Sequence, residues 1–151
     1  MKKILLFIGL LLPWFLSSLL PVDYNYYKTL TLPFFAPPNI FYIIAWSLTY
    51  IFITISTYQV NTKYNSKDIP KKYKNTLIIN YIFNQSFQLV FFIFKNNFLG
   101  FISCLGTFIS LLFLRKETKL LNKKSNKYLI PYLLLSIFAT ILSLSIYLLN
   151  L

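Results

Sequence analysis

Apolar residues along this chain occur in five long runs that are separated by shorter polar stretches. The runs cover residues 4–20, 39–60, 75–94, 98–114 and 128–149. An α-helix needs roughly 20 apolar residues to cross the hydrocarbon core of a bilayer, and each run has about that length. The pattern therefore predicts an all-α membrane protein, with a single domain over residues 1–151 built as a bundle of five transmembrane helices.

The connection over residues 21–38 differs from the other polar stretches because it is rich in tyrosine and phenylalanine. Pro33, Pro37 and Pro38 argue against a regular helix there. A linker that stayed in water would not carry so many rings, so we expect this loop to fold back onto the protein or the membrane surface. Residues 61–74 and 115–127 are polar and basic, and we expect both to be loops.

The basic residues are distributed unequally between the two ends of this arrangement. The end that holds the N-terminus and the two basic loops has 13 of the 15, and the other end has only Lys28 and Lys95. The positive-inside rule then places the N-terminus in the cytoplasm and the C-terminus outside. An alternative reading treats the first run as a cleaved secretory signal. Pro13, Trp14 and the lack of a clear cleavage site favour a retained helix.

Composition excludes several other classes of protein. The chain is 57% hydrophobic and 12% charged, which fits neither a soluble globule nor a disordered chain. The net charge of +12 would suggest nucleic acid in a soluble protein, but beside apolar runs it marks topology, and we expect no nucleic-acid partner. With no histidine and one cysteine, Cys104, we expect no His-based metal site and no catalytic triad. The abundance of Lys, Asn and Ile suggests an AT-rich bacterial genome, so we expect the protein to lie in a bacterial cytoplasmic membrane.

Amide side chains form a stripe on the third run. Asn80, Asn84 and Gln88 recur every fourth residue and so share one helical face. For Asn84 and Gln88, helix packing and ligand contact are equally good interpretations, because an unpaired amide is costly in an apolar interior. Trp46 fits either a core or a pocket wall. No charged side chain lies inside a run, which favours a site for a large apolar ligand over an ion pathway.

Three stretches resemble one known family. They are PFFAPPNIFYIIAWSLTY (33–50), NQSFQLVFFIF (84–94) and IPYLLLSIFATILSLSIYLLN (130–150). They are similar to the proline- and aromatic-rich first loop with the second helix, to the third helix and to the fifth helix of the tryptophan-rich sensory proteins. Those proteins are bacterial relatives of the mitochondrial translocator protein, or peripheral benzodiazepine receptor. The resemblance covers nearly the whole chain and implies a five-helix bundle, commonly a homodimer, with a ligand cavity beneath the first loop.

The resemblance also implies ligands and residue roles. Family ligands are tetrapyrroles such as protoporphyrin IX, sterols and synthetic drugs. Trp46 and Tyr50 match the pocket residues of the second helix, Asn84 matches the third-helix Asn, and Ala139 beside Phe138 matches the fifth helix. The candidate ligand-binding residues are Trp46, Tyr50, Asn84, Phe87, Gln88, Phe91, Leu135, Phe138, Ala139, Leu142 and, on the loop that covers the pocket, Pro33 and Phe35.

The chain also departs from the family pattern. Leu135 stands where a fifth-helix Trp is usual, Ser143 where an Asn is usual, and Ser103 where an Asp is frequent. We therefore expect a membrane receptor or binding protein for porphyrin-like or other flat hydrophobic ligands. The alternatives are light-dependent porphyrin degradation at the same pocket, which the loss of a Trp at Leu135 weakens, a transporter of such ligands, and a structural component without a small ligand.

Overall fold

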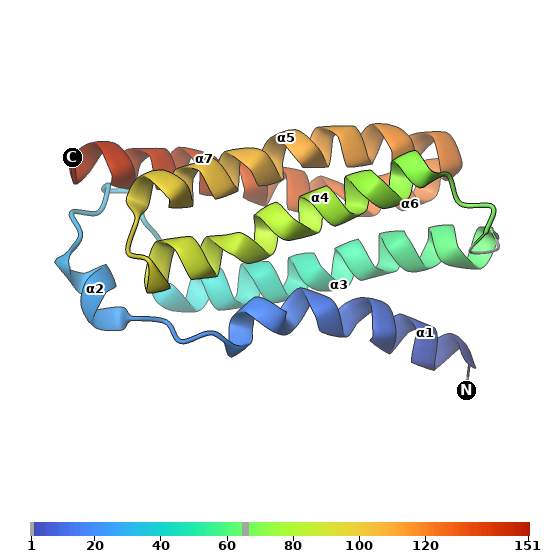
Figure 1. Cartoon of the computed structure of the whole chain (residues 1–151), viewed down its shortest axis with the longest axis horizontal. Helices are drawn as coiled ribbons and strands as arrows, with labels where there is room; N and C mark the ends of the chain where they lie inside the picture. Colours follow the sequence, from blue (N-terminus) through green and yellow to red (C-terminus); the bar gives the residue numbers. More distant parts are fainter. Residues whose placement is uncertain (1, 65–66) are drawn as a thin grey trace.

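The computed structural model describes residues 2–64 and 67–151, and these residues form helices joined by short connections, with no strand among them (Figure 1). The helical elements are α1 (Lys2–Leu11), the 3-10 helix η1 (Leu12–Leu19), α2 (Tyr24–Thr29), α3 (Asn39–Lys63), α4 (Lys71–Gln88), the π-helical turn η2 (Leu89–Ile93), α5 (Asn97–Leu121), α6 (Lys123–Tyr128) and α7 (Ile130–Leu149).

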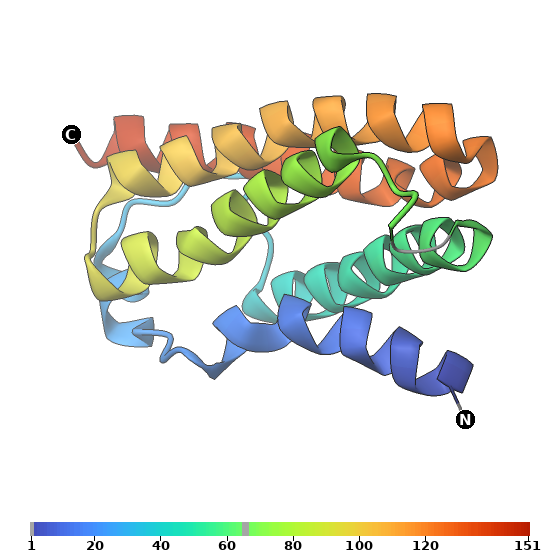
Figure 2. The ribbon, with the colours of Figure 1, turned by 45° about the vertical axis from the view of Figure 1, so that its right-hand side comes forward.

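The long helices run side by side as a bundle. α1 lies beside α3, and α5 packs against both α4 and α7 (Figure 2). The N-terminus and the C-terminus lie at opposite ends of the bundle, with α2 at the end that holds the C-terminus (Figure 1). Four helical stretches are long and apolar enough to cross a membrane, namely Asn39–Lys63, Lys71–Ile93, Asn97–Leu121 and Lys123–Leu149. The apolar stretch Lys3–Leu19 is shorter than these four.

The boundaries of the first, third and fifth expected helices differ from the apolar runs. The first run divides into α1 and η1, because Pro13 at the start of η1 cannot continue the α-helical hydrogen bonding of α1. α4 begins at Lys71, four residues before the apolar run. The expected fifth helix begins earlier as α6, and it is interrupted at Leu129 next to Pro131, from which α7 continues.

Two expected loops are partly or mostly helical. Residues 115–127 are not a loop: α5 continues to Leu121, and α6 occupies most of the rest. Residues 21–38 contain the short helix α2 ahead of the prolines, where the Asp23 side chain accepts a hydrogen bond from the Tyr26 N–H and caps the helix. The 61–74 connection is shorter than expected, because α3 ends at Lys63 and α4 begins at Lys71.

Hydroxyl side chains inside the bundle satisfy their own hydrogen bonding. Thr54 donates to the carbonyl of Tyr50 at 2.8 Å, and Thr107 donates to that of Ser103 at 2.8 Å. Such bonds to the preceding turn let a polar residue lie in an apolar environment without an unpaired donor. Most Ser and Thr residues of the bundle are thus explained by packing alone.

Close packing of α4 on α5 depends on a glycine. The ring of Phe83 lies directly against Gly106, in the space that a Cβ atom would fill. Asn80 lies on α4 one turn before Phe83 and is fully buried. Its amide donates to the Thr107 carbonyl at 3.0 Å and accepts from the Tyr132 hydroxyl at 3.0 Å. Asn80 therefore fixes α4 against α5 and α7, and it belongs to the packing of the bundle.

Candidate functional site

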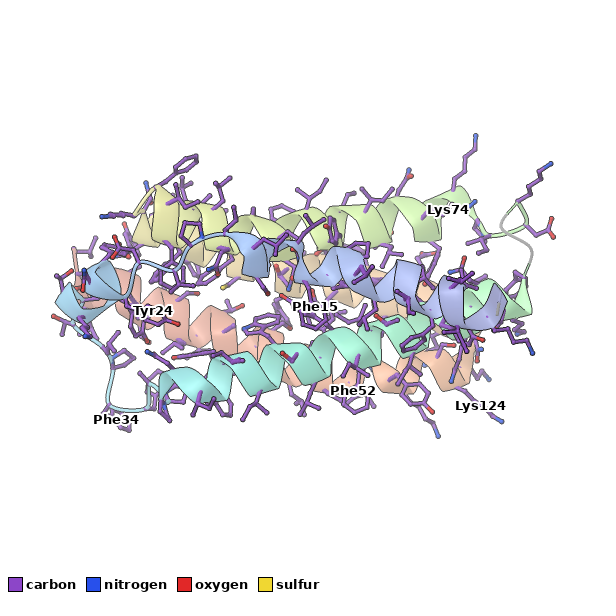
Figure 3. The ribbon with its side chains drawn as sticks, turned by 90° about the horizontal axis from the view of Figure 1, so that it is seen from below. Phe15, Tyr24, Phe34, Phe52, Lys74 and Lys124 are labelled. Carbon is purple, nitrogen blue, oxygen red and sulfur yellow. The ribbon has the colours of Figure 1, made fainter. Side chains whose placement is uncertain are left out.

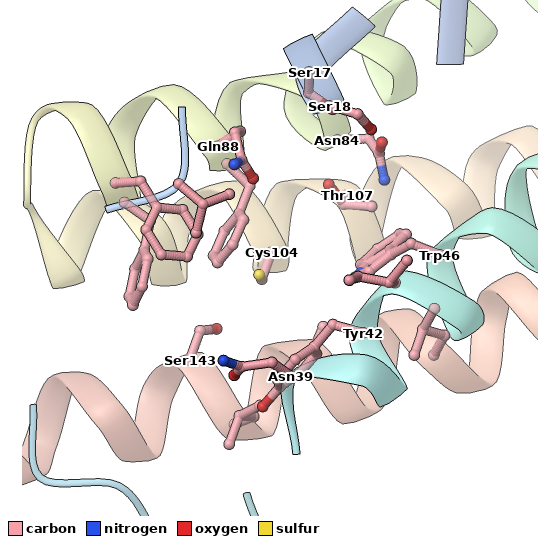
Figure 4. Close-up of a pocket in the computed structure, with 18 of the residues that line it drawn as sticks. Ser17, Ser18, Asn39, Tyr42, Trp46, Asn84, Gln88, Cys104, Thr107 and Ser143 are labelled. Atoms are coloured by element: carbon pink, nitrogen blue, oxygen red, sulfur yellow. The ribbon is translucent and has the colours of Figure 1, made fainter. Parts of the chain in front are cut away.

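A cavity of about 410 Å³ opens between the helices at the end of the bundle that carries α2 (Figure 4). Its volume lies in the range of pockets that hold drug-sized ligands. Every long element except α1 contributes to its wall, and none of the lining residues that the structure describes is charged. They are Ser17, Ser18, Val22, Tyr24, Tyr27, Asn39, Tyr42, Ile43, Trp46, Ser47, Tyr50, Asn84, Phe87, Gln88, Phe91, Phe92, Cys104, Thr107, Leu135, Ser136, Phe138, Ala139, Leu142, Ser143 and Ile146.

Ten of the twelve candidate residues line this cavity, and Pro33 and Phe35 do not. Those two border a shallow hollow on the outer surface between the loop and α7. The Phe35 ring meets the Phe138 ring edge-on, with centroids 6.4 Å apart, so Phe35 packs behind one wall of the cavity. Within the loop, Val22 and the α2 residues Tyr24 and Tyr27 border the cavity itself.

Aromatic rings on α4 and η2 form one wall. Phe87 and Phe91 stack with centroids 5.1 Å apart and planes 14° from parallel. The helix widens beside these rings at η2, where the Phe94 N–H bonds to the carbonyl of Leu89, five residues back, at 3.0 Å. Such π-turns add one residue to a helix turn and are frequent at functional sites. The opposite wall carries Trp46, so a flat ligand would meet rings on both sides.

Asn84 presents its two polar atoms differently. Its Oδ1 accepts from the Tyr50 hydroxyl at 3.3 Å and from Gln85 Nε2 at 3.0 Å. Its Nδ2 has the Tyr132 hydroxyl nearby as an internal acceptor, and it also borders the cavity. Figure 4 shows this nitrogen on the cavity side. Asn84 thus packs through its oxygen and offers N–H donors to a ligand.

Gln88 lies one helical turn beyond Asn84 and also borders the cavity. Its side chain is half-buried and makes no hydrogen bond to the residues that the structure describes. An amide provides both donors and an acceptor. Gln88 is therefore the cavity side chain best able to adapt to either kind of polar group on a ligand.

Gln85 connects this site to η1. Its Oε1 accepts from the Ser17 N–H at 2.8 Å, and its Nε2 donates to the Trp14 carbonyl at 3.1 Å. These are backbone groups of a 3-10 segment, in which α-helical bonding is incomplete. Gln85 thereby holds η1 against α4 and places Ser17 and Ser18 on the cavity rim.

The loop over residues 21–38 is fastened at both of its ends. At the first end, Asp23 forms an ion pair of 2.9 Å with Lys95, and the Tyr26 hydroxyl donates to Asn97 at 2.7 Å. The Tyr26 N–H bond and then the Lys95 ammonium lower the pKa of Asp23 below its usual range. Near the second end, the Asn150 amide bonds to the backbone of residue 31 twice, at 2.8 and 2.9 Å. The loop is therefore held across the mouth of the cavity.

Several lining residues were missed from the sequence. Tyr42 lies four residues before Trp46 on α3, a spacing that could have identified it. Cys104 and Thr107 on α5 share a face at a spacing of three, but small residues of this kind are common in any helix interface. Ser18 carries no sequence signal, because its position depends on how η1 is held by Gln85.

Known proteins are similar to this chain over nearly its whole length. Residues 4–149 match the sequence pattern of the TspO/MBR family. The chain is 37% identical over 134 residues to "Tryptophan-rich protein TspO" of Bacillus cereus, covering 89% of this chain and 86% of that protein. It is 33% identical over 133 residues to "Uncharacterized membrane protein YtaB" of Bacillus subtilis, covering 88% and 85%. It is 29% identical over 128 residues to "Tryptophan-rich protein TspO" of Archaeoglobus fulgidus, covering 83% and 80%.

Proposed function

The chain belongs to the TspO/MBR family, and on that premise we propose that it binds a porphyrin-like tetrapyrrole or another flat hydrophobic molecule in the cavity. The observation that carries this proposal is the uncharged cavity of about 410 Å³ with rings on facing walls. Aromatic rings interact with a flat ligand by stacking, and the enclosed space removes apolar surface from water. Phe87 and Phe91 already lie nearly parallel and would form one stacking surface.

The polar groups of the cavity suggest how such a ligand would be oriented. Asn84 offers only N–H donors, because its oxygen is used by Tyr50 and Gln85. A carbonyl or carboxylate on the rim of the ligand would satisfy those donors. The aromatic core of the ligand would then lie toward Phe87 and Phe138, with Gln88 adjusting to the remaining polar groups.

The membrane arrangement we propose has five crossings, in which α1 and η1 together make the first. The N-terminus would lie in the cytoplasm of a bacterial cell and the C-terminus outside its cytoplasmic membrane. The support is the charge asymmetry, with 13 of 15 basic residues at one end of the bundle. The cavity then opens toward the outer end, beneath the loop that holds α2. The homodimer implied by the family resemblance belongs to the same proposal.

Binding is a better proposal than light-dependent degradation because of one position. Leu135 lines the cavity where the resemblance places a tryptophan, so Trp46 is the lone Trp among the lining residues described. Trp14 lies behind Tyr50, with ring centroids 5.9 Å apart. A second photochemically active indole is thus missing from the cavity wall.

The test is a titration of the purified full chain with protoporphyrin IX, following both its absorbance and the Trp fluorescence. We expect saturable binding. Ala139→Phe fills the cavity from α7 and should weaken binding at least about tenfold, or ~1.4 kcal/mol. The matched control is Ile141→Phe, because Ile141 lies on the same helix but is 53% exposed on the outer surface.

The two tryptophans provide a second control. In the absorbance titration, Trp46→Phe should weaken porphyrin binding more than Trp14→Phe does, since Trp46 borders the cavity and Trp14 lies behind Tyr50. Non-saturable quenching, or equal binding by the Ala139→Phe and Ile141→Phe variants, would refute a site in this cavity. Loss of bound porphyrin only under light and oxygen would instead support degradation.

A further inference from the structure

Unneutralised positive charge gathers where α5 meets α6. Lys124 points outward at this end of the bundle, opposite Tyr24 and Phe34 (Figure 3). Residues 115–127 contain six basic side chains and a single acidic one, Glu117. The Glu117 carboxylate already forms an ion pair with the Lys72 ammonium of α4, with 2.9 Å between Nζ and Oε1. The six basic residues, none of which takes part in the ion pairs found among the described residues, are Arg115, Lys116, Lys119, Lys123, Lys124 and Lys127.

Arg115 differs from the surrounding lysines because the fold fixes its orientation. Its Nε donates to the Asn126 side-chain oxygen of α6 at 3.3 Å. Its two terminal nitrogens bond to nothing among residues 2–64 and 67–151. With Nε held, the plane of the guanidinium is set while its outer N–H groups remain available. A guanidinium presented in this way matches the oxygens of a phosphate in a two-point hydrogen bond.

The same face of α5 becomes apolar toward the middle of the bundle. Leu112 and Ile109 lie three and six residues before Arg115, and they are 45% and 44% exposed. Lys119 lies four residues after Arg115, so each of the four side chains is a surface neighbour of the next, and together they form one stripe that winds along the helix. The stripe changes from apolar to basic in a single turn. A phospholipid shows the same order of chemistry, with acyl chains followed by a phosphate.

We propose that the corner between α5 and α6 is a binding site for an anionic phospholipid. Arg115 holds the headgroup phosphate, Lys119 and Lys127 add charge beside it, and Ile109 and Leu112 contact the upper acyl chain. A soluble polyanion would use the charges but would leave the exposed apolar stripe uncovered. The site lies at the opposite end of the bundle from α2, and it does not depend on what the cavity binds.

The experiment counts lipids bound to the full chain in a mild detergent by native mass spectrometry, with dioleoyl phosphatidylglycerol or dioleoyl phosphatidylcholine added. We expect phosphatidylglycerol to bind at least about tenfold more tightly. Arg115→Gln should weaken its binding at least about fivefold, the effect expected for one basic residue at a lipid surface. The phosphatidylglycerol affinity of Arg115→Lys should lie between those of the parent chain and Arg115→Gln, because lysine keeps the charge and lacks the planar guanidinium. Lys28 lies on α2 at the opposite end of the bundle, so Lys28→Gln should leave phosphatidylglycerol binding unchanged.

Further arms separate a lipid site from a site for any anion. Leu112→Ser should weaken phosphatidylglycerol binding without changing competition by inorganic phosphate. Equal binding of the two lipids, or equal effects of Arg115→Gln and Lys28→Gln, would overturn the proposal. Complete displacement of the lipid by millimolar inorganic phosphate would overturn it in favour of a free-anion site. Should Arg115→Gln lower the thermal midpoint in detergent alone, Lys119→Gln takes its place in the same comparison.

Discussion

The contact between Gly106 and Phe83 gives a sharp test of how α4 packs on α5. A Cβ atom at residue 106 would lie 2.5 Å from Cε1 and 2.7 Å from Cγ of the Phe83 ring. Favourable contacts between carbon atoms are about 3.5–4.0 Å. In a Gly106→Ala variant, the ring or the helix that carries it must therefore move by about 1 Å. Because Asn84 follows Phe83 directly on α4, this movement would also displace a wall of the cavity.

The expected magnitude combines two opposing effects. Overpacking of a tight helix contact costs about 1–3 kcal/mol. Alanine in place of glycine within a helix returns up to ~1 kcal/mol. We therefore expect the free energy of unfolding of a Gly106→Ala variant to fall by about 0.5–2 kcal/mol and its thermal midpoint to fall by a few degrees. Gly9→Ala is the matched control, because nothing lies within 4 Å of a Cβ at residue 9. That variant should be at least as stable as the parent chain.

The measurement is a thermal melt followed by circular dichroism, with both variants and the parent chain in one fixed detergent. Repeating Gly106→Ala in a Phe83→Ala background completes a double-mutant cycle. Without the ring, the alanine at residue 106 should cost nothing. If the penalty persists there, or if Gly106→Ala proves as stable as Gly9→Ala, the reasoning about this contact is wrong.

Three further predictions concern the loop and the polar core. The pKa of Asp23 is lowered from 3.8, so its ion pair with Lys95 holds the loop at neutral pH and is lost as the pH falls below about 4 through that lowered pKa. Limited proteolysis of residues 21–38 should therefore become faster in the parent chain only at such acidic pH, and in the Asp23→Asn variant already at pH 7. Asn150→Ala removes two bonds to the backbone of Thr31, so hydrogen exchange at the Thr31 amide should become faster while exchange in α5 is unchanged. Asn80→Ala leaves buried partners unpaired and should cost about 1–3 kcal/mol, seen as a lower thermal midpoint; an unchanged midpoint would show that water replaces the amide.

Hydropathy located the helices well but not their ends. The apolar run ends at Leu114, whereas α5 continues to Leu121. The added segment, RKETKLL, consists largely of good helix formers that happen to be polar. A pattern that finds residues compatible with lipid cannot detect a helix that extends beyond the membrane. α2 was missed for a related reason, since its start depends on the Asp23 cap and on contacts with Lys95 that are distant in sequence.

The cavity was predicted unevenly for physical reasons. Amides that recur at helical spacing, namely Asn80, Asn84 and Gln88, could be assigned to one face from the sequence. Phe35 was assigned to the pocket cover through its position in the loop, but the path of a loop depends on its fastening points. Asn150 provides one such point, 119 residues away from Thr31, and no local pattern announces it.

The wide turn at η2 also sets the direction in which the chain leaves α4. A turn with one residue more than a regular helix needs can in principle give that residue up, and deleting Val90 would restore ordinary α-helical winding. Within the regular part of α4, each residue removed would rotate everything beyond it by about 100° and carry Lys95 away from Asp23. At η2 the deletion takes out only the residue that the wide turn holds, so the chain beyond keeps its direction and the ion pair with Asp23 is kept. The wide turn thus lets this stretch carry one more residue without moving the first fastening of the loop.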